Sequence, residues 1–82
     1  MSAYVEVHGG EYPTLYARVA VDGECWDLQG DAYEKSNGKF YQVIGQCDVT
    51  GIVILKDLWD GVEEYVLARN SDLLYFKAVT DG

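Results

Sequence analysis

The sequence predicts a mainly β fold, an antiparallel meander of seven or eight short strands that forms a small barrel or sandwich. Short runs that alternate apolar and polar residues are typical of half-buried strands. Asp-Gly or Asn-Gly stands between such runs at 22–23, 37–38 and 60–61, and these dipeptides are preferred in two-residue hairpin turns. Aromatic residues, which favour strands, make up 13% of the chain.

Length and composition indicate one globular domain over residues 1–82. Hydrophobic residues make up 49% of the chain and charged residues 24%, which are ordinary values for a folded protein. The charge is unusual, since the formal net charge is -8. Such a charge repels nucleic acid and anionic membranes and attracts basic surfaces.

The first expected strand covers residues 2–8. Ala3, Val5 and Val7 alternate there with polar or aromatic neighbours. The glycine pair at 9–10 indicates a loop. Pro13 has no N–H to donate, so we expect it at the start of the second strand or on an edge strand.

The strongest hairpin signal lies in residues 15–28, around Asp22-Gly23. A two-residue turn there places Val19 opposite Trp26 and Arg18 opposite Asp27. Because side chains alternate along a strand, the two faces can be assigned. The predicted core face holds Leu15, Ala17, Val19, Val21, Trp26 and Leu28. The predicted outer face holds Tyr16, Arg18, Ala20, Cys25 and Asp27.

A second hairpin is expected around Asn37-Gly38, between residues 32–36 and 39–45. Neither of its faces is purely apolar. Gly45 is a candidate for a β-bulge. Residues 52–55, which are all aliphatic, predict a buried strand.

Residues 56–70 fit two interpretations. As a hairpin around Asp60-Gly61, Trp59 faces Val62 and Leu55 faces Val66, at the cost of a like-charge pair between Asp57 and Glu64. The alternative is an α+β fold with one helix near residues 58–69, capped by Asp60 with Glu63 three positions on. The hairpin is favoured because turns of the same kind are already expected at Asp22-Gly23 and Asn37-Gly38.

The chain is expected to end with a turn at 70–72 and a strand over 73–79. In that strand Leu74, Phe76 and Ala78 share one face.

The cysteines, the N-terminus and the short apolar runs predict a cytoplasmic protein. Cys25 and Cys47 lie far apart with no nearby histidine, so we expect reduced thiols. A disulfide between them is the alternative for an exported protein. The N-terminus lacks the pattern of a secretory signal, and the longest apolar run is too short to span a bilayer.

Enzymatic, cofactor and metal chemistry are not expected. His8 is the single histidine and stands beside two glycines, which is typical of a surface residue at the end of a strand rather than of a general base in a substrate pocket. The acids Asp57, Asp60, Glu63 and Glu64 lack the residue order of a calcium loop, so they predict a solvated acidic face.

Acidity together with seven tyrosines therefore predicts a protein that binds another protein. The expected partner offers a basic surface, and neither direct nucleic-acid binding nor a membrane is expected. The densest acids rank first as partner-binding residues, and other acids and two tyrosines follow. The full set is Asp57, Asp60, Glu63, Glu64, Asp27, Asp31, Glu34, Tyr16 and Tyr33.

In size and charge alone, the chain resembles small acidic phage proteins of the anti-CRISPR or nucleic-acid-mimic kind. That resemblance implies an inhibitor that occupies a basic nucleic-acid-binding site. The alternatives are an immunity or antitoxin-type protein that neutralises a toxin enzyme, a small-molecule-binding β-barrel, and a homo-oligomeric structural subunit. In the last case an open sheet edge would pair with a copy of itself as a homodimer or larger assembly.

Overall fold

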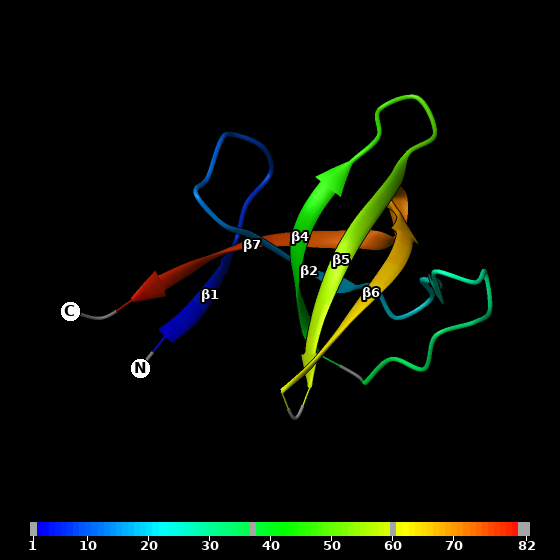
Figure 1. Ribbon diagram of the computed structural model, residues 1–82. Helices are drawn as coiled ribbons and strands as arrows, with labels where there is room; N and C mark the ends of the chain where they lie inside the picture. The colour runs from blue at the N-terminus through cyan, green and yellow to red at the C-terminus, as the bar shows by residue number, and fades with distance from the viewer. Residues whose placement is uncertain (1, 37, 60, 81–82) are drawn as a thin grey trace.

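The computed structural model describes residues 2–36, 38–59 and 61–80, which form one seven-stranded antiparallel sheet (Figure 1). The order across the sheet is β1-β7-β2-β4-β5-β6-β3. The strands are β1 (Ser2–Glu6), β2 (Leu15–Val19), β3 (Cys25–Asp27), β4 (Phe40–Gln46), β5 (Ile52–Trp59), β6 (Val62–Arg69) and β7 (Leu73–Thr80), with a 3-10 turn η1 (Asn70–Asp72) before β7. The predicted mainly β fold is confirmed, and the helix near residues 58–69 is wrong because β6 occupies that stretch.

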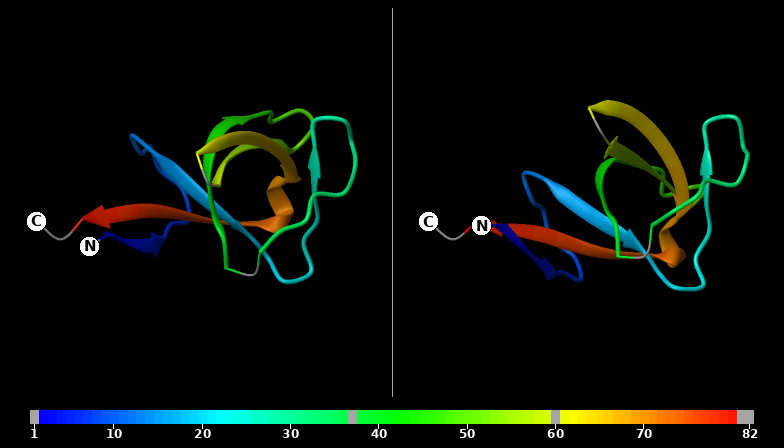
Figure 2. Two further views of the ribbon diagram at one scale, coloured as in Figure 1. Left: turned by 60° about the horizontal axis from the view of Figure 1, so that its bottom comes forward. Right: turned by 90° about the horizontal axis from the view of Figure 1, so that it is seen from below.

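The sheet has a curled part and an arm. Figure 2 shows β4, β5 and β6 bending around a central space, while β1 and the end of β7 project to one side. The arm arises because β7 is long enough to pair with two strands in turn. Its first residues pair with β2, from Leu73 to Phe76, and the stretch from Phe76 to Thr80 pairs with β1.

Side chains on the inner side of the curl form the core. Among the residues whose burial the structure describes, β2 to β7 each contribute at least one side chain to it. The buried members are Ala17, Cys25, Tyr41, Val53, Leu55, Val66, Ala68 and Leu73. Neighbours two apart in one strand, such as Val53 and Leu55, both point inward because side chains alternate.

The β5–β6 hairpin has the predicted register. Trp59 is opposite Val62, Leu55 is opposite Val66, and Asp57 is opposite Glu64. Gly61, in the turn, has a φ of 79°, the left-handed conformation that a type I′ turn requires. This hairpin prediction is confirmed.

The predicted hairpin over residues 15–28 is wrong. β2 lies between β7 and β4, whereas β3 pairs with β6 on the far edge of the sheet. The chain does turn here, but Gly23 closes the turn as its fourth residue, with its N–H donating to the Ala20 carbonyl at 2.9 Å. The φ of Gly23 lies outside the left-handed region. The chain needs glycine here for close packing instead, since an added Cβ would lie 2.9 Å from the Asp72 carbonyl oxygen.

The faces predicted for the second half of that stretch are inverted as a result. Cys25 is in the core, and Trp26 is half-buried with the Arg69 guanidinium 4.9 Å from its ring centroid. Val21 and Leu28, predicted to be inside, are 89% and 57% exposed.

The predicted pair of Arg18 with Asp27 is also wrong. The Arg18 guanidinium lies over the Phe76 ring, because β2 and β7 are neighbours. Asp27 instead accepts hydrogen bonds from backbone N–H groups of its own turn. Of the predicted core face, Ala17 is buried and Val19 packs against the core.

The second predicted hairpin is wrong as well. β4 pairs with β2 and β5, and residues 33–36 form no strand. Ala32 makes a single bridge to Trp26, and Asn37 lies outside the described residues. The Lys35 ammonium binds the carbonyls of Ala20 and Gly23, so side-chain contacts hold this segment.

The remaining elements agree with the sequence. The first strand, the turn at 70–72 and the final strand are present, and the register of β4 on β5 shifts between Val43 and Gly45, which confirms the bulge. Residues 52–55 form a half-buried strand rather than a buried one, since Ile54 faces outward. The described residues contain no helix long and apolar enough to cross a membrane.

Candidate protein-binding surface

Acids that lie far apart in the sequence meet at two adjoining hollows beside the start of β6. The larger hollow, of about 490 Å³, lies between residues 33–36 and β6. The smaller, of about 350 Å³, lies between residues 27–29 and β6. Tyr33 and Glu64 line both hollows. We call the surface around them the Tyr33 surface, defined by Asp27, Tyr33, Glu34, Glu63 and Glu64. Asp31, also in the predicted set, lines neither hollow and lies in the adjoining turn, where its N–H donates to Asp27 Oδ1.

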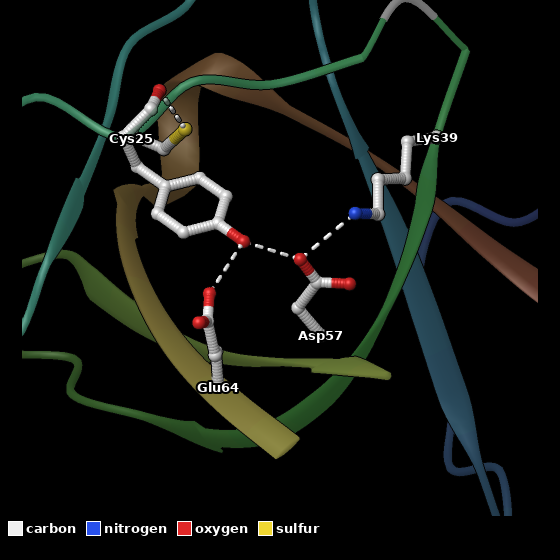
Figure 3. Close-up of polar contacts among 5 residues, drawn as sticks. Cys25, Lys39, Asp57 and Glu64 are labelled. Carbon is white, nitrogen blue, oxygen red and sulfur yellow. Dashed lines mark hydrogen bonds and ion pairs between the residues drawn. The ribbon is translucent and has the colours of Figure 1, made fainter. Parts of the chain in front are cut away.

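The hydroxyl of Tyr33 joins the two sides of this surface. It hydrogen-bonds to the carboxylate of Asp57 and lies 3.1 Å from Glu64 Oε2. Figure 3 shows Asp57 and Glu64 approaching it from neighbouring strands. Burial, and then the hydrogen bonds and negative charges of the two carboxylates, raise the pKa of Tyr33 well above its usual range. Tyr33 therefore stays protonated and donates at any physiological pH.

Asp57 is a buried supporting residue, which corrects the prediction that it belongs to a solvated face. It is 2% exposed, because position 57 follows Val53 and Leu55 on the inner side of β5. Lys39 Nζ lies 2.8 Å from Asp57 Oδ2 (Figure 3). This ion pair therefore connects the residue just before β4 to the inner side of β5, beneath Tyr33.

The other acids of the predicted set differ in what they already bind. Asp27 Oδ1 accepts the N–H groups of Gln29 at 2.9 Å and Asp31 at 3.0 Å, so it fixes the turn after β3. Glu63 is exposed and lies 3.2 Å from Lys56. Glu34 and Glu64 are exposed as well, so three glutamates point charge at solvent on this surface.

Tyr16, another member of the predicted set, is not on the Tyr33 surface. Tyr16 belongs to an aromatic cluster on the other side of the sheet, where its ring centroid lies 5.0 Å from that of Tyr4. Tyr4 in turn stacks on Phe40 at 4.1 Å. Asp60 lies outside the described residues.

The sequence interpretation missed the two lysines at this site. Lys39 pairs with Asp57, and Lys35 lines the larger hollow while it binds the turn carbonyls. No local pattern indicates either contact, because the partners are 12 to 18 residues away. The inward position of Asp57, by contrast, was readable from the alternation that places Leu55 in the core.

The two cysteines are free thiols in different environments. Cys25 is buried, and burial raises the pKa of its thiol. Cys47 is exposed, and hydrogen bonds from Thr50 lower the pKa of its thiol. The Cys25 thiol donates a hydrogen bond to the backbone carbonyl of Tyr33 at 3.5 Å (Figure 3), whereas Cys47 lines neither of the two hollows. Within the described ranges no group of three or more His, Cys, Asp or Glu side chains is placed to hold a metal ion.

Comparisons with protein-family models, with curated proteins and with solved structures found no match to this chain. The chemistry of the Tyr33 surface is therefore what indicates a function.

Proposed function

We propose that this protein is a non-catalytic inhibitor whose Tyr33 surface binds a basic surface of a partner protein and blocks it. One observation carries the proposal. Acids from residues 27–34 and from the start of β6 converge on two adjoining hollows around one tyrosine. Tyrosine supplies rigid contact area at protein interfaces, and acids supply complementarity to a basic patch.

The charge of the chain favours a partner that normally binds nucleic acid. A net charge of -8 on a small body attracts the basic sites that recognise phosphate backbones. An acidic protein that occupies such a site excludes the nucleic acid. A phage-type inhibitor of the nucleic-acid-mimic kind acts in this way, in the cytoplasm of the host. Neutralisation of a basic toxin enzyme would use the same surface.

The test reverses charge on the Tyr33 surface. The partner is captured from the native host, identified by mass spectrometry, purified and titrated with the variant Glu34→Lys, Glu63→Lys, Glu64→Lys. We expect association to slow by about tenfold or more, because charges at the rim of an interface act mainly on the on-rate. The matched control reverses Glu11, Asp22 and Asp48, which are exposed elsewhere and give the same change in net charge. Equal effects of the two variants would contradict the proposal.

Salt and competition complete the test. Binding should weaken with salt, because the Debye length falls from about 10 Å at 0.1 M to about 3 Å at 1 M. A nucleic acid that the partner binds should compete with the inhibitor. Salt-independent affinity, or simultaneous binding of both, argues against mimicry.

Self-association through β1 is a second candidate function, favoured by a separate observation. β1 stands at the edge of the sheet, and Tyr4 and Val5 are exposed on it. An open edge of this length is a template for pairing with a second copy. Sedimentation at the mass of the 9.2 kDa monomer, at concentrations up to the millimolar range, would exclude it.

A further inference from the structure

We propose that residues 62–65 of β6 form an open strand edge that takes up an extended basic segment of the partner as an added strand. This inference rests on the proposed function and gives it a mode of binding. Strand addition obtains affinity from main-chain hydrogen bonds and specificity from alternate side chains. It therefore needs free backbone groups on one side of a strand and complementary side chains beside them.

The direction of the backbone groups along β6 follows from one hydrogen bond. In an antiparallel pair, residues that bond to the neighbouring strand alternate with residues that point away from it. The Asn70 N–H donates to the Gly51 carbonyl at 2.7 Å, one step beyond the pair of Arg69 with Ile52. Residues of even number in β6, including Glu64 and Val66, therefore bond to β5. Glu63 and Tyr65 point their backbone groups away from β5.

The hydrogen bonds of β3 independently give the same assignment of odd- and even-numbered residues in β6. Asp27 N–H donates to the Asp31 carbonyl and Tyr33 N–H donates to the Cys25 carbonyl, so these two residues of β3 face away from β6. Trp26, between them, then faces Leu67, its register partner. An odd residue of β6 again bonds toward β3.

β3 does not extend far enough to cover the start of β6. Its pairing ends at Asp27 opposite Val66, and the chain then turns away through residues 28–31. Within the described residues, the backbone N–H and carbonyl groups of Glu63 and Tyr65 therefore have no strand partner. These four groups can bind one short added strand.

The side chains beside this edge fit a segment that carries both charge and apolar surface. Glu63 and Tyr65 lie on the outer side of β6, and Val62 and Glu64 lie on the inner side, so each side has one acid and one apolar or aromatic group. All four residues are exposed. The two hollows flank the edge and leave room for the side chains of an added strand.

Charge decides between a basic segment and a second copy of this edge. Antiparallel pairing of the edge with itself brings Glu63 and Glu64 close to their own copies, and like charges in facing positions destabilise a strand pair. A segment with Lys or Arg at alternate positions instead places positive charges on one side of the sheet, beside one of these two glutamates. A basic partner segment is therefore the occupant that this edge favours.

The probe is an acetylated and amidated heptapeptide that alternates lysine with valine. Binding should slow amide exchange at Glu63 and Tyr65, while Glu64 and Val66 are already protected in the free protein. The same peptide methylated on every backbone nitrogen keeps its charges but donates no backbone hydrogen bond. We expect it to bind about tenfold more weakly or worse.

Two variants of the same residue separate backbone from charge. Glu63→Pro removes the outward N–H without removing a bond to β5, and edge strands tolerate proline at such positions. Glu63→Gln removes the same charge and keeps the N–H. We expect the proline variant to bind the unmethylated peptide about tenfold more weakly than the glutamine variant. If the proline variant does not fold, amide exchange in the wild-type protein decides.

Each outcome separates the two proposals. If both peptides bind equally and the proline and glutamine variants are alike, strand addition is overturned and the acidic surface stands. If neither peptide protects Glu63 and Tyr65, strand addition is also overturned. The proposed function fails separately, when reversal of Glu34, Glu63 and Glu64 leaves partner binding unchanged.

Discussion

The same dipeptide, Asp-Gly, has two different structural roles in this molecule. Gly61 adopts a φ of 79°, and a Cβ on it would meet nothing within 4 Å. Gly23 does not adopt the left-handed conformation, and a Cβ on it would lie 2.8 Å from Val19 Cγ1. One glycine is needed for backbone conformation and the other for close packing. A turn dipeptide therefore predicts that the chain turns, but the strands on either side decide whether a hairpin forms.

The two pairs of flanking strands differ in what they can bury. β5 and β6 have 8 residues each and pair along their whole length, so their best partner is the next strand in the chain. β3 has 3 residues and β2 has 5, and β2 finds longer strands on both sides, β4 and β7. The local turn at residues 20–23 therefore leads from one part of the sheet to its opposite edge.

The largest effect on stability is expected where Asp57 of the β5–β6 hairpin contacts Lys39, just before β4. Asp57→Ala should lower the free energy of unfolding by about 3–5 kcal/mol, because it removes the buried carboxylate that pairs with Lys39 and accepts from the Tyr33 hydroxyl. Urea unfolding measures this change. The double variant Asp57→Ala, Lys39→Met should lose less than the sum of the single variants, because each single variant already removes the same contact between the two side chains. Additive losses would mean that the pair is not coupled.

A smaller effect separates the two glycines directly. Gly23→Ala and Gly61→Ala should each cost on the order of 1–3 kcal/mol, the first by overpacking against Asp72 and the second by backbone strain. Asparagine distinguishes the causes because it tolerates positive φ. Gly61→Asn should be milder than Gly61→Ala in thermal melting, whereas Gly23→Asn should be at least as harmful as Gly23→Ala. Rescue of Gly23 by asparagine would restore the hairpin interpretation.

At neutral pH, Tyr33→Phe should lower the free energy of unfolding by about 1–2 kcal/mol, because the hydrogen bonding of its hydroxyl is lost.

The stability of the protein should also depend on pH in the alkaline range. The folded pKa of Tyr33 is raised, so the unfolded state releases the proton first as pH rises. Stability should be full below about pH 10, the ordinary value for tyrosine, and should fall above it. Tyr41, whose pKa is raised by burial, contributes in the same direction.

Urea unfolding between pH 8 and 11.5 measures this slope. Tyr33→Phe should reduce the alkaline loss of stability, and Tyr16→Phe is the control because it lies outside the Tyr33 network. An unchanged slope in Tyr33→Phe would place its hydroxyl in solvent.

Chemical labelling of the two cysteines in the wild-type protein tests the inverted face of β3 without any substitution. Cys47 should react with a thiol reagent at least about a hundredfold faster than Cys25, since it is exposed and its thiolate is favoured. Mass spectrometry of the partly labelled protein gives both rates. Equal rates would place Cys25 on the surface, as the hairpin over residues 15–28 predicts.

The sequence by itself determined the fold class, the positions of β1, β5, β6 and β7, the bulge at Gly45 and the register of one hairpin. These features depend on period-2 alternation and on turns between adjacent runs, which are local properties of the chain. Even the burial of Asp57 was implied by that alternation.

Only the tertiary structure decided the partners of β2, the inward direction of Cys25 and the meeting of Tyr33 with Asp57 and Glu64. These contacts join residues 24 and 31 positions apart. A strand of 3 to 5 residues fits several neighbours about equally well, so its partner is chosen by the apolar surface that the whole sheet can bury when it curls. The acidic surface and the open edge of β6 result from that choice, because β3 is short enough to leave residues 62–65 uncovered.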